Sequence, residues 1–488
     1  MTNKEFKEAM SVLGNGDGPE EIDKKRKKRN ALRAVTVCSA AAVICIGVAI
    51  AITAVVTRKA DDGKTKKELL NRPTAAPTDE PASEDREYES LKKGVGVRFL
   101  STGSVANTGT KEPVSEDFRH NYTEFALELA GRTNEGSGTL VSPLSVITAM
   151  LMTANGASGE TYSEMMSVLA GGMTADKANR ELLVFTESLK NTGYAMLESS
   201  NAVFVSDRDD FKINKRFVHE ISSSFKGEIA CADFINDLQR SVKEINSWCN
   251  EKTKGMIPDI LDPSTLDPDT VMVLINAVCF DALWDTPFPF TYDGVFHGTK
   301  GDTKVTMMRS AQEPFYIESK NATGFMKPYC GQYGFAALLP KEGVGTQELL
   351  SSLDAKAWFD LMENDRGTAN ANMPKFSFDW EGSLNDVLSG MGIKKAFSAY
   401  EADFSGLGRL DDGRGLFINK VVHKTHIDVD EAGTRASAAT AVEMVPNSVY
   451  DPEIPKNVTL DRPFVYAIID CETKLPVFIG TVNDITAG

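Results

Sequence analysis

Histidine is the side chain most used for general base catalysis and zinc binding, and the chain has five histidines. His423 and His426 lie close together, but their spacing is not the HExxH zinc pattern, and in a strand the two rings would point to opposite faces. The chain also lacks a G-x-S-x-G nucleophile turn and a Walker-type phosphate loop. We therefore expect no enzymatic activity, no cofactor and no metal site.

The seven cysteines give no sign of a metal site or of a disulfide framework. Two of them, Cys38 and Cys45, lie in an apolar run, and the other five are dispersed without CxxC spacing. An odd and scattered set of this kind is typical of buried thiols that behave as small hydrophobic side chains.

A segment near the C-terminus, residues 430–443, combines small side chains with a two-residue alternation. One face is small or apolar, and the opposite face carries both charges, on Arg435 and Glu443. This alternation is what a half-buried β-strand needs, whereas a solvated loop does not need it. We interpret the segment as one that is exposed in one state and becomes a sheet strand in another, the alternative being an ordinary Ala/Ser/Thr-rich surface loop. The small or apolar face consists of Thr434, Ala436, Ala438, Thr440 and Val442.

This segment resembles the reactive-centre hinge of the serpins, and further motifs extend the resemblance over about residues 115–488 in the family's chain order. Each motif alone is weak, but a dozen in the right order are specific. They include Val141-Ser142-Pro143-Leu144-Ser145, Asn155-Gly156-Ala157, Ile245-Asn246-Ser247-Trp248, Leu274-Ile275-Asn276-Ala277-Val278, Pro374-Lys375-Phe376, Ala402-Asp403-Phe404-Ser405-Gly406, Val422-His423-Lys424, Asp461-Arg462-Pro463-Phe464 and Phe478-Ile479-Gly480.

The resemblance implies the α+β serpin fold, in which helices pack on a large mixed sheet with two smaller sheets and an exposed reactive-centre loop. It also implies suicide inhibition. A target serine protease attacks the loop and forms a covalent acyl complex, and the cleaved hinge then inserts into the main sheet. The alternative is a non-inhibitory serpin that acts as a carrier or binding module. We expect the protein to be a monomer.

The resemblance assigns roles along the hinge and the loop. Counting seventeen residues from Glu431 places the reactive bond between Asn447 and Ser448. The stretch that follows is longer than usual, so Met444 or Val445, which suit an elastase-like pocket, and Tyr450, which suits a chymotrypsin-like one, stay open. The implied inserting residues are Glu431, Gly433, Thr434, Ala436, Ser437, Ala438, Ala439 and Thr440.

A polar cluster is implied where the main sheet parts. Its members are Ser142, Ser145, Asn276 and His423, and Trp284 matches the family's tryptophan beneath the hinge. A buried hydrogen-bond network can hold two strands together and exchange partners when they separate. The alternative is a set of ordinary satisfied polar groups.

Hydrophobic periodicity predicts the elements that would carry these residues. Apolar residues at helical spacing from Phe118 to Leu129 predict a helix that ends at Gly131, and Pro143 begins a second helix. An apolar run predicts a strand covered on both faces, and two later runs predict a closing hairpin. The strands are residues 271–280, 464–469 and 477–482.

The N-terminal part differs from the rest in charge. Residues 1–33 carry nine Lys or Arg against six Asp or Glu, although the whole chain has a net charge of −16. The remainder is thus acidic, and we expect no nucleic-acid partner. Residues 34–57 are uncharged and long enough to cross a hydrocarbon core of about 30 Å.

From this pattern we expect a retained signal anchor, single-pass in the cell membrane, with a cytoplasmic basic tail at 1–33 and an extracellular serpin domain at 115–488. A cleaved secretory signal and a buried core helix are the alternatives. Residues 58–114 have the polar, proline-containing composition of a flexible linker, with a possible short strand at 95–100 to which we assign no role. Anchoring without many disulfides suggests a bacterial cell.

Overall fold

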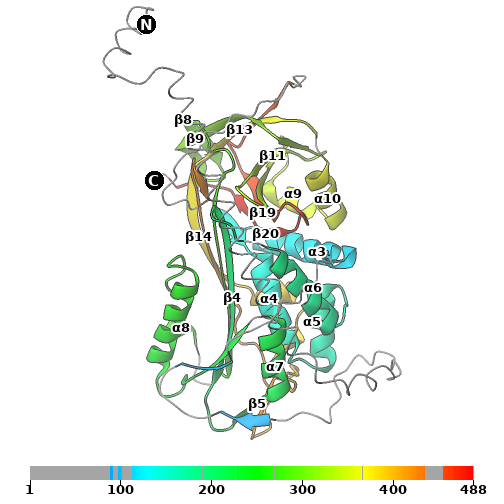
Figure 1. Ribbon diagram of the computed structural model, residues 1–488, viewed down its shortest axis with the longest axis vertical. Helices are drawn as coiled ribbons and strands as arrows, with labels where there is room; N and C mark the ends of the chain where they lie inside the picture. Colours follow the sequence, from blue (N-terminus) through cyan, green and yellow to red (C-terminus); the bar gives the residue numbers. More distant parts are fainter. Residues whose placement is uncertain are drawn as a thin grey trace, which may run out of the picture. The chain divides into compact units, whose positions relative to one another are not determined.

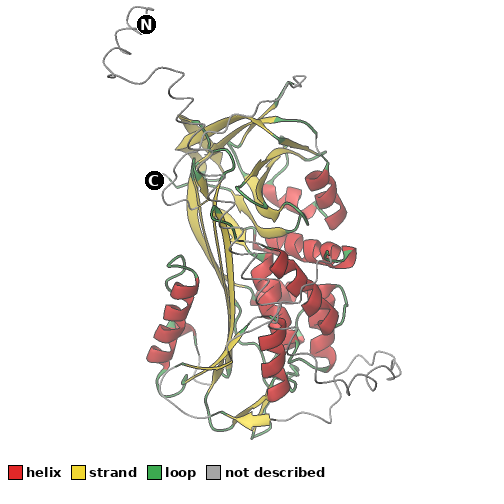
Figure 2. Cartoon of the chain, viewed as in Figure 1, coloured by secondary structure: helices red, strands yellow, loops and turns green. Residues whose placement is uncertain are grey.

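The computed structural model describes residues 88–91, 97–101, 113–189, 191–225, 227–266, 270–364, 366–434 and 454–486. All of them belong to the second of the two units into which the chain divides, Asp79–Gly488. The described residues of this unit form helices and four β-sheets, and the largest sheet has seven strands (Figures 1 and 2). The expected α+β organisation is confirmed.

The seven-stranded sheet is the main sheet. It has mixed pairing, with β4 parallel to β6 and antiparallel to β7. Its order is β14 (Phe376–Ser383), β16 (Val422–Val429), β17 (Gly433–Thr434), β7 (Met272–Leu283), β4 (Ala195–Ser206), β6 (Glu228–Ala232) and β2 (Arg98–Ser101).

The other strands of the described residues form three smaller sheets, one more than expected. The six-stranded sheet has the order β10 (Phe315–Glu318), β11 (Ala322–Pro328), β12 (Tyr333–Pro340), β19 (Phe464–Asp470), β20 (Pro476–Val482) and β3 (Gly138–Val141). The four-stranded sheet has the order β18 (Lys456–Thr459), β13 (Ala369–Pro374), β9 (Gly301–Glu313) and β8 (Phe290–Gly298). The three-stranded sheet consists of β1 (Tyr88–Ser90), β5 (Phe211–Asn214) and β15 (Gly408–Leu410).

The helices cover both faces of the main sheet, with α8 on one side and the group around α4 on the other (Figure 1). They are α3 (Glu116–Thr133), α4 (Pro143–Ala154), α5 (Gly159–Ala170), α6 (Ala175–Ser188), α7 (Lys215–Ser224), α8 (Leu238–Lys252), α9 (Thr346–Ser351), α10 (Ala355–Glu363) and α11 (Asn385–Met391), with 3-10 turns η1 (Pro263–Thr265) and η2 (Lys395–Phe397).

Two hydrophobic cores follow from the two-residue period of the central strands. On β4, Ala202 and Phe204 pack in the core beneath α8, whereas Val203 and Val205 pack in the larger core on the opposite face. Because β7 is divided in the same way, the prediction of a strand covered on both faces is confirmed. The closing hairpin is also confirmed, as β19 and β20.

Two local details differ from expectation. Helix α3 does not end at Gly131 but continues to Thr133, where Asn134 forms its C-cap. The possible strand at 95–100 is present as β2, and it pairs with the outer edge of β6. Pairing with β2 covers an edge that would otherwise present unpaired backbone groups.

The structure corrects the localisation prediction. Within the described ranges no helix is long and apolar enough to cross a membrane, so the expectation of a single-pass protein of the cell membrane is not supported. Residues 34–57, on which that expectation was placed, lie outside the described residues.

The cysteines agree with the expectation of isolated thiols. The five within the described residues are all free, and Cys231, Cys249 and Cys279 are buried. Burial raises the pKa of the Cys249 thiol to about 12, which keeps it protonated and unreactive.

Phe204 provides a test of the core beneath α8. Its ring is fully buried and meets the Trp248 ring edge-on at a centroid distance of 5.7 Å. We expect Phe204→Ala to lower the free energy of unfolding by about 3–5 kcal/mol, because the loss of a buried ring leaves a cavity. Urea unfolding measured by circular dichroism checks this. Phe290→Ala, at a ring that is 68% exposed, serves as the control, and an equal loss in both variants would contradict the assigned core.

Candidate functional site at the opening of the main sheet

A tight turn at residues 430–433 joins β16 to β17. The Asp430 carboxylate accepts hydrogen bonds from the backbone N–H groups of Ala432, at 2.7 Å, and Gly433, at 3.1 Å. The Asp430 N–H donates to the Gly433 carbonyl at 3.0 Å. An aspartate that binds the backbone two and three residues ahead is a common way to begin a turn. The turn directs the hinge back along the sheet instead of away from it.

The first hinge residues already occupy a strand position. In β17, Thr434 pairs with Val429 of β16 on one side, and Gly433 and Thr434 pair with Leu283 and Ala282 of β7 on the other. Glycine is required at 433 by space, since a Cβ there would lie 2.1 Å from the Ala282 carbonyl oxygen. The main sheet therefore holds a two-residue strand between β16 and β7.

An aromatic cluster of Trp284, Phe288 and Tyr329 holds this turn and strand in place. The Trp284 indole N–H donates to the Asp430 carbonyl, its backbone N–H donates to Ala432, and the Phe288 N–H donates to Glu431, each at 2.9 Å. The rings of Trp284 and Tyr329 stack at 4.3 Å, and the Tyr329 hydroxyl lies 2.5 Å from the Thr434 hydroxyl. Because Thr434 is only 2% exposed, this partner satisfies a hydroxyl that water does not reach.

Glu431 lies at the outer side of the turn and forms an ion pair with Lys375 at 2.5 Å. Partial burial acts in the opposite direction, but the Lys375 ammonium lowers the pKa of the Glu431 carboxyl. The pair is more than one third exposed on Lys375, so its main contribution is to orient the turn rather than to stabilise the whole fold.

The predicted polar cluster is partly assembled further down the sheet. The Ser142 N–H donates to His423 Nε2 at 3.0 Å, the Ser142 hydroxyl donates to the Val477 carbonyl at 2.9 Å, and it accepts from the Ser145 N–H at 3.2 Å. These contacts join the N-terminus of α4 to β16 and β20. Asn276 lies on β7, where its backbone is opposite Asn201 of β4.

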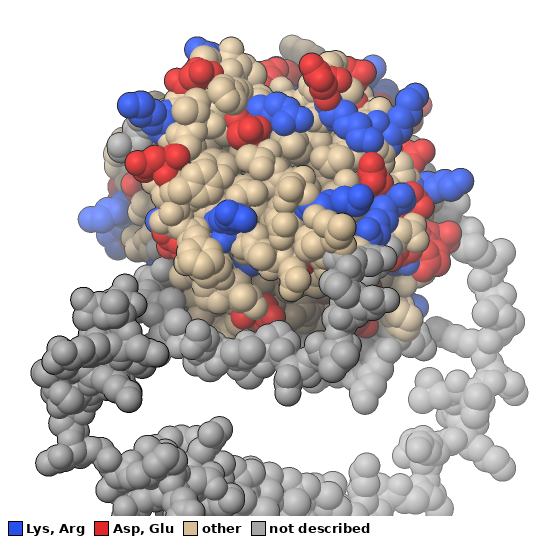
Figure 3. Space-filling model, turned by 90° about the horizontal axis from the view of Figure 1, so that it is seen from above, with Lys and Arg blue, Asp and Glu red and all other residues tan. Residues whose placement is uncertain are grey.

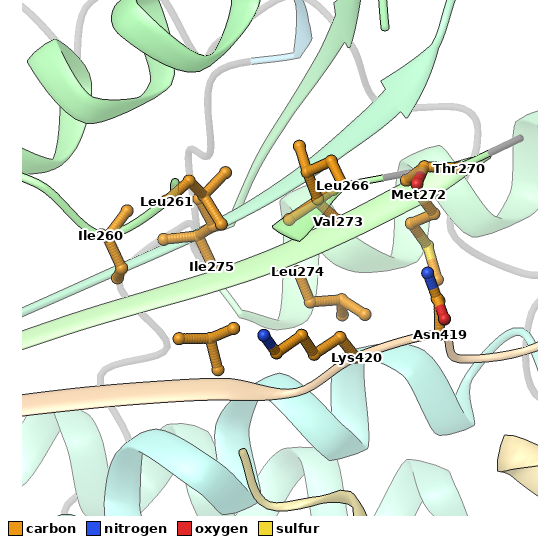
Figure 4. Close-up of a pocket in the computed structure, with 11 residues that line it drawn as sticks. Ile260, Leu261, Leu266, Thr270, Met272, Val273, Leu274, Ile275, Asn419 and Lys420 are labelled. Carbon is orange, nitrogen blue, oxygen red and sulfur yellow. The ribbon is translucent and has the colours of Figure 1, made fainter. Parts of the chain in front are cut away.

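A small, mainly apolar pocket lies between the lower part of β7 and the residues that lead into β16 (Figure 4). Leu274, Lys420 and Val422 line it at the sheet, and Ile260 and Leu261 line it from the segment after α8. The pocket therefore lies beside the part of the sheet where β7 and the residues before β16 face each other.

The remaining predicted residues of the loop lie outside the described residues. They are Ala436, Ser437, Ala438, Ala439, Thr440, Asn447 and Ser448, with the alternatives Met444, Val445 and Tyr450. In the part of the chain that the structure describes, no cluster of His, Cys, Asp and Glu is suited to hold a metal ion.

Sequence reasoning did not assign a role to several residues of the site. Tyr329 and Lys375 were assigned no role, and Asp430 was only the first residue of the segment 430–443. Tyr329 is 105 positions away from Thr434, and no local spacing indicates that the two meet. For Asp430 a signal was available, because aspartate two residues before alanine and three before glycine is a turn pattern.

Comparison with known proteins defines the class of protein. The family profile described as Serpin (serine protease inhibitor) matches residues 120–485. An uncharacterized serpin-like protein of Thermococcus kodakarensis is 34% identical over 383 residues, which cover 77% of this chain and 87% of the relative. The leukocyte elastase inhibitor of Xenopus laevis is 30% identical over 373 residues, 73% of this chain and 97% of the relative.

Solved structures give the same result. The native state of the thermophilic serpin tengpin has a TM-score of 0.73 at 36% identity, covering 80% of this chain and 100% of tengpin. Its latent state has a TM-score of 0.67 at 35% identity, covering 77% and 100%. The chain belongs to the serpin family. A family described as protease inhibitors agrees with the expectation that the chain is not an enzyme, whereas a bacterial source stays a prediction.

The buried His423 predicts a pH-dependent stability. Burial lowers the pKa of His423 to about 4 from its ordinary 6.5, so the unfolded chain takes up a proton at a higher pH than the folded chain does. The contribution of neutral His423 to the free energy of unfolding is therefore fully present above about pH 6.5. It is lost as the pH falls towards 4, by on the order of 3 kcal/mol. Urea unfolding as a function of pH measures this loss.

A variant at His423 isolates this contribution. His423→Gln retains an acceptor for the Ser142 N–H but does not titrate, so the stability should change less between pH 6.5 and 4. His297→Gln, at a histidine whose side chain is 58% exposed, is the matched control and should keep the wild-type slope. Identical slopes in wild type and His423→Gln would mean that another group causes the loss.

Proposed function

We propose that the protein is a suicide inhibitor of serine proteases that traps the acyl-enzyme by inserting its cleaved reactive loop into the main sheet. The observation that carries the proposal is the position of Gly433 and Thr434, which pair with both β16 and β7. Insertion of the following hinge residues then extends an existing strand and needs no new nucleus. The alternation of small side chains from Thr434 to Val442 fits a strand buried on one face.

The chemical steps are those of an interrupted proteolysis. The catalytic serine of the target attacks the carbonyl carbon of Asn447, the peptide bond to Ser448 breaks, and the new amine of Ser448 leaves with the proton from the serine. Asn447 is then esterified to the target. Insertion of the hinge carries the esterified end along the sheet and distorts the attached protease before water can hydrolyse the ester.

Loop insertion can supply enough free energy for this distortion. About ten new main-chain hydrogen bonds at about 1 kcal/mol each amount to on the order of 10 kcal/mol. The whole stability of an ordinary domain is about 5–15 kcal/mol. The free energy released by insertion is therefore comparable with the free energy that stabilises the folded protease and its active site.

The uncharged residues around the proposed bond favour elastase-like or chymotrypsin-like targets. Met444 and Val445 suit an elastase-like pocket, and the similarity to a leukocyte elastase inhibitor supports the same class. On the end that bears the four-stranded sheet, Lys and Arg side chains stand among Asp and Glu side chains (Figure 3). A mixed surface of this kind does not select a target by one sign of charge.

Incubation with elastase-like and chymotrypsin-like proteases tests the function. We expect a complex that survives SDS, with a mass equal to that of the protease plus the chain cleaved at the loop. Mass analysis of the released C-terminal peptide identifies the bond, which we expect between Asn447 and Ser448. Cleavage without a complex across a broad panel of proteases would contradict the proposal and favour a non-inhibitory carrier or binding module.

Thr434→Arg tests insertion separately from recognition. The side chain at 434 is 2% exposed in β17 of the uncleaved chain, so a buried arginine without a partner would displace the short strand that the inserting hinge must extend. We expect the variant to be cleaved as a substrate, with the SDS-stable complex reduced at least about tenfold by an insertion penalty above about 1.4 kcal/mol. Thr434→Ser keeps the hydroxyl that meets Tyr329 and should inhibit like wild type. Undiminished complex formation by Thr434→Arg would refute the insertion step.

A further inference from the structure

A buried ion pair lies against the aromatic cluster that holds the hinge. Lys327 of β11 and Glu313 at the end of β9 are 1% and 6% exposed, and the Lys327 ammonium lies 2.5 Å from the Glu313 carboxylate. The Ser310 hydroxyl also donates to Glu313. A buried pair of this kind is an unexpected use of two charges, since well-packed apolar side chains in its place are often as stable or more stable.

The ammonium group also faces two of the three rings of the cluster. It lies 4.4 Å from the centroid of the Phe288 ring and 5.7 Å from that of Trp284. The two rings meet edge-on at 5.9 Å and 87°. A desolvated cation over a ring face is a directional attraction, so it favours one orientation of each ring over others that fill the same space.

The same two residues hold the start of the hinge. Trp284 binds the carbonyl groups of Asp430 and Ala432, and Phe288 binds that of Glu431. A change in the orientation of the Trp284 ring moves its indole N–H, which is the donor to Asp430. The charges at 327 and 313 are thus connected to the turn at 430–433 through a single layer of side chains.

We propose that Lys327 and Glu313 are positioning residues for loop insertion, in that their ion pair fixes the rings of Trp284 and Phe288, the two residues whose indole and backbone N–H groups bind the hinge turn at the opening of the sheet. The inference rests on the proposed function and adds a control element to it. Before cleavage the pair keeps the turn and β17 in register with β7. After cleavage this register determines whether the hinge inserts before the acyl-enzyme is hydrolysed.

The test uses the double variant Lys327→Met/Glu313→Gln in the full chain. Lys327→Met alone would leave a buried carboxylate without its partner, and the chain could fail to fold for that reason. The double variant keeps the volume and an acceptor for Ser310. Two quantities are measured: hydrogen exchange of the backbone amides of 430–434 in the uncleaved chain, and the number of inhibitor molecules consumed per protease molecule inactivated.

We expect the exchange at 430–434 to accelerate and the stoichiometry of inhibition to rise, each by about three- to thirtyfold, the range that the loss of a desolvated cation–π contact produces. The melting temperature should stay at or above the wild-type value. If the ion pair only stabilised the fold, a variant with an unchanged melting temperature would show unchanged stoichiometry and unchanged exchange at 430–434.

A matched control removes a similar pair elsewhere. Arg119 lies 4.4 Å from the Phe359 ring centroid and 2.7 Å from the Glu363 carboxylate, and among the described residues neither contacts the turn at 430–434. Arg119→Met/Glu363→Gln should leave the exchange at 430–434 and the stoichiometry unchanged. An equal effect in this control, or exchange that accelerates uniformly in the Lys327 variant with a lower melting temperature, would overturn the positioning role.

The outcome separates this inference from the proposed function. If wild type forms no complex with any protease, the function fails, but the exchange measurement on the uncleaved chain still decides the role of the pair. Wild-type exchange at 430–434 in the double variant overturns the inference even where wild type inhibits normally.

Discussion

The pairing of Gly433 and Thr434 between β16 and β7 is the contact on which the arrangement of the main sheet depends. A sheet gains stability when every inner strand has a neighbour on both sides, and here one position is filled for only two residues. The glycine permits the close approach to the Ala282 carbonyl, and the buried threonine hydroxyl meets Tyr329. Both residues of β17 are thereby held by specific contacts.

Two kinds of chemistry hold the sheet at different heights. Near the turn, the backbone N–H groups of Trp284 and Phe288 donate to the carbonyl groups of the hinge turn, and the rings of these two residues pack against each other. Lower down, Ser142 and His423 connect α4 to β16 through a buried hydrogen bond. Hydrogen bonds exchange partners without loss of packed volume, whereas interlocked apolar side chains do not. Polar contacts would thus suit strands that separate in the proposed insertion.

Local patterns in the chain predicted much of the fold. The strand at β7, the hairpin of β19 and β20 and the helix that begins at Pro143 all follow from periodicity or from a residue that limits the backbone. The end of α3 was predicted two residues early, because glycine is tolerated near a helix end when tertiary packing continues beyond it. The membrane prediction rested on the length and apolar composition of residues 34–57 and on the basic residues before them, and the described residues contain no spanning helix to support it.

The sequence by itself determined the family through motifs in a fixed order, and it shows the alternation of small side chains that predicts a hinge, because such an alternation is a property of neighbouring residues. Only the tertiary structure decided which distant side chains surround the hinge. Tyr329 meets Thr434 and Lys327 meets Glu313 because strands from three different sheets end at the same place. The two-residue strand β17 was equally beyond local reasoning. Its existence depends on the distance between β16 and β7, and no property of residues 433 and 434 encodes that distance.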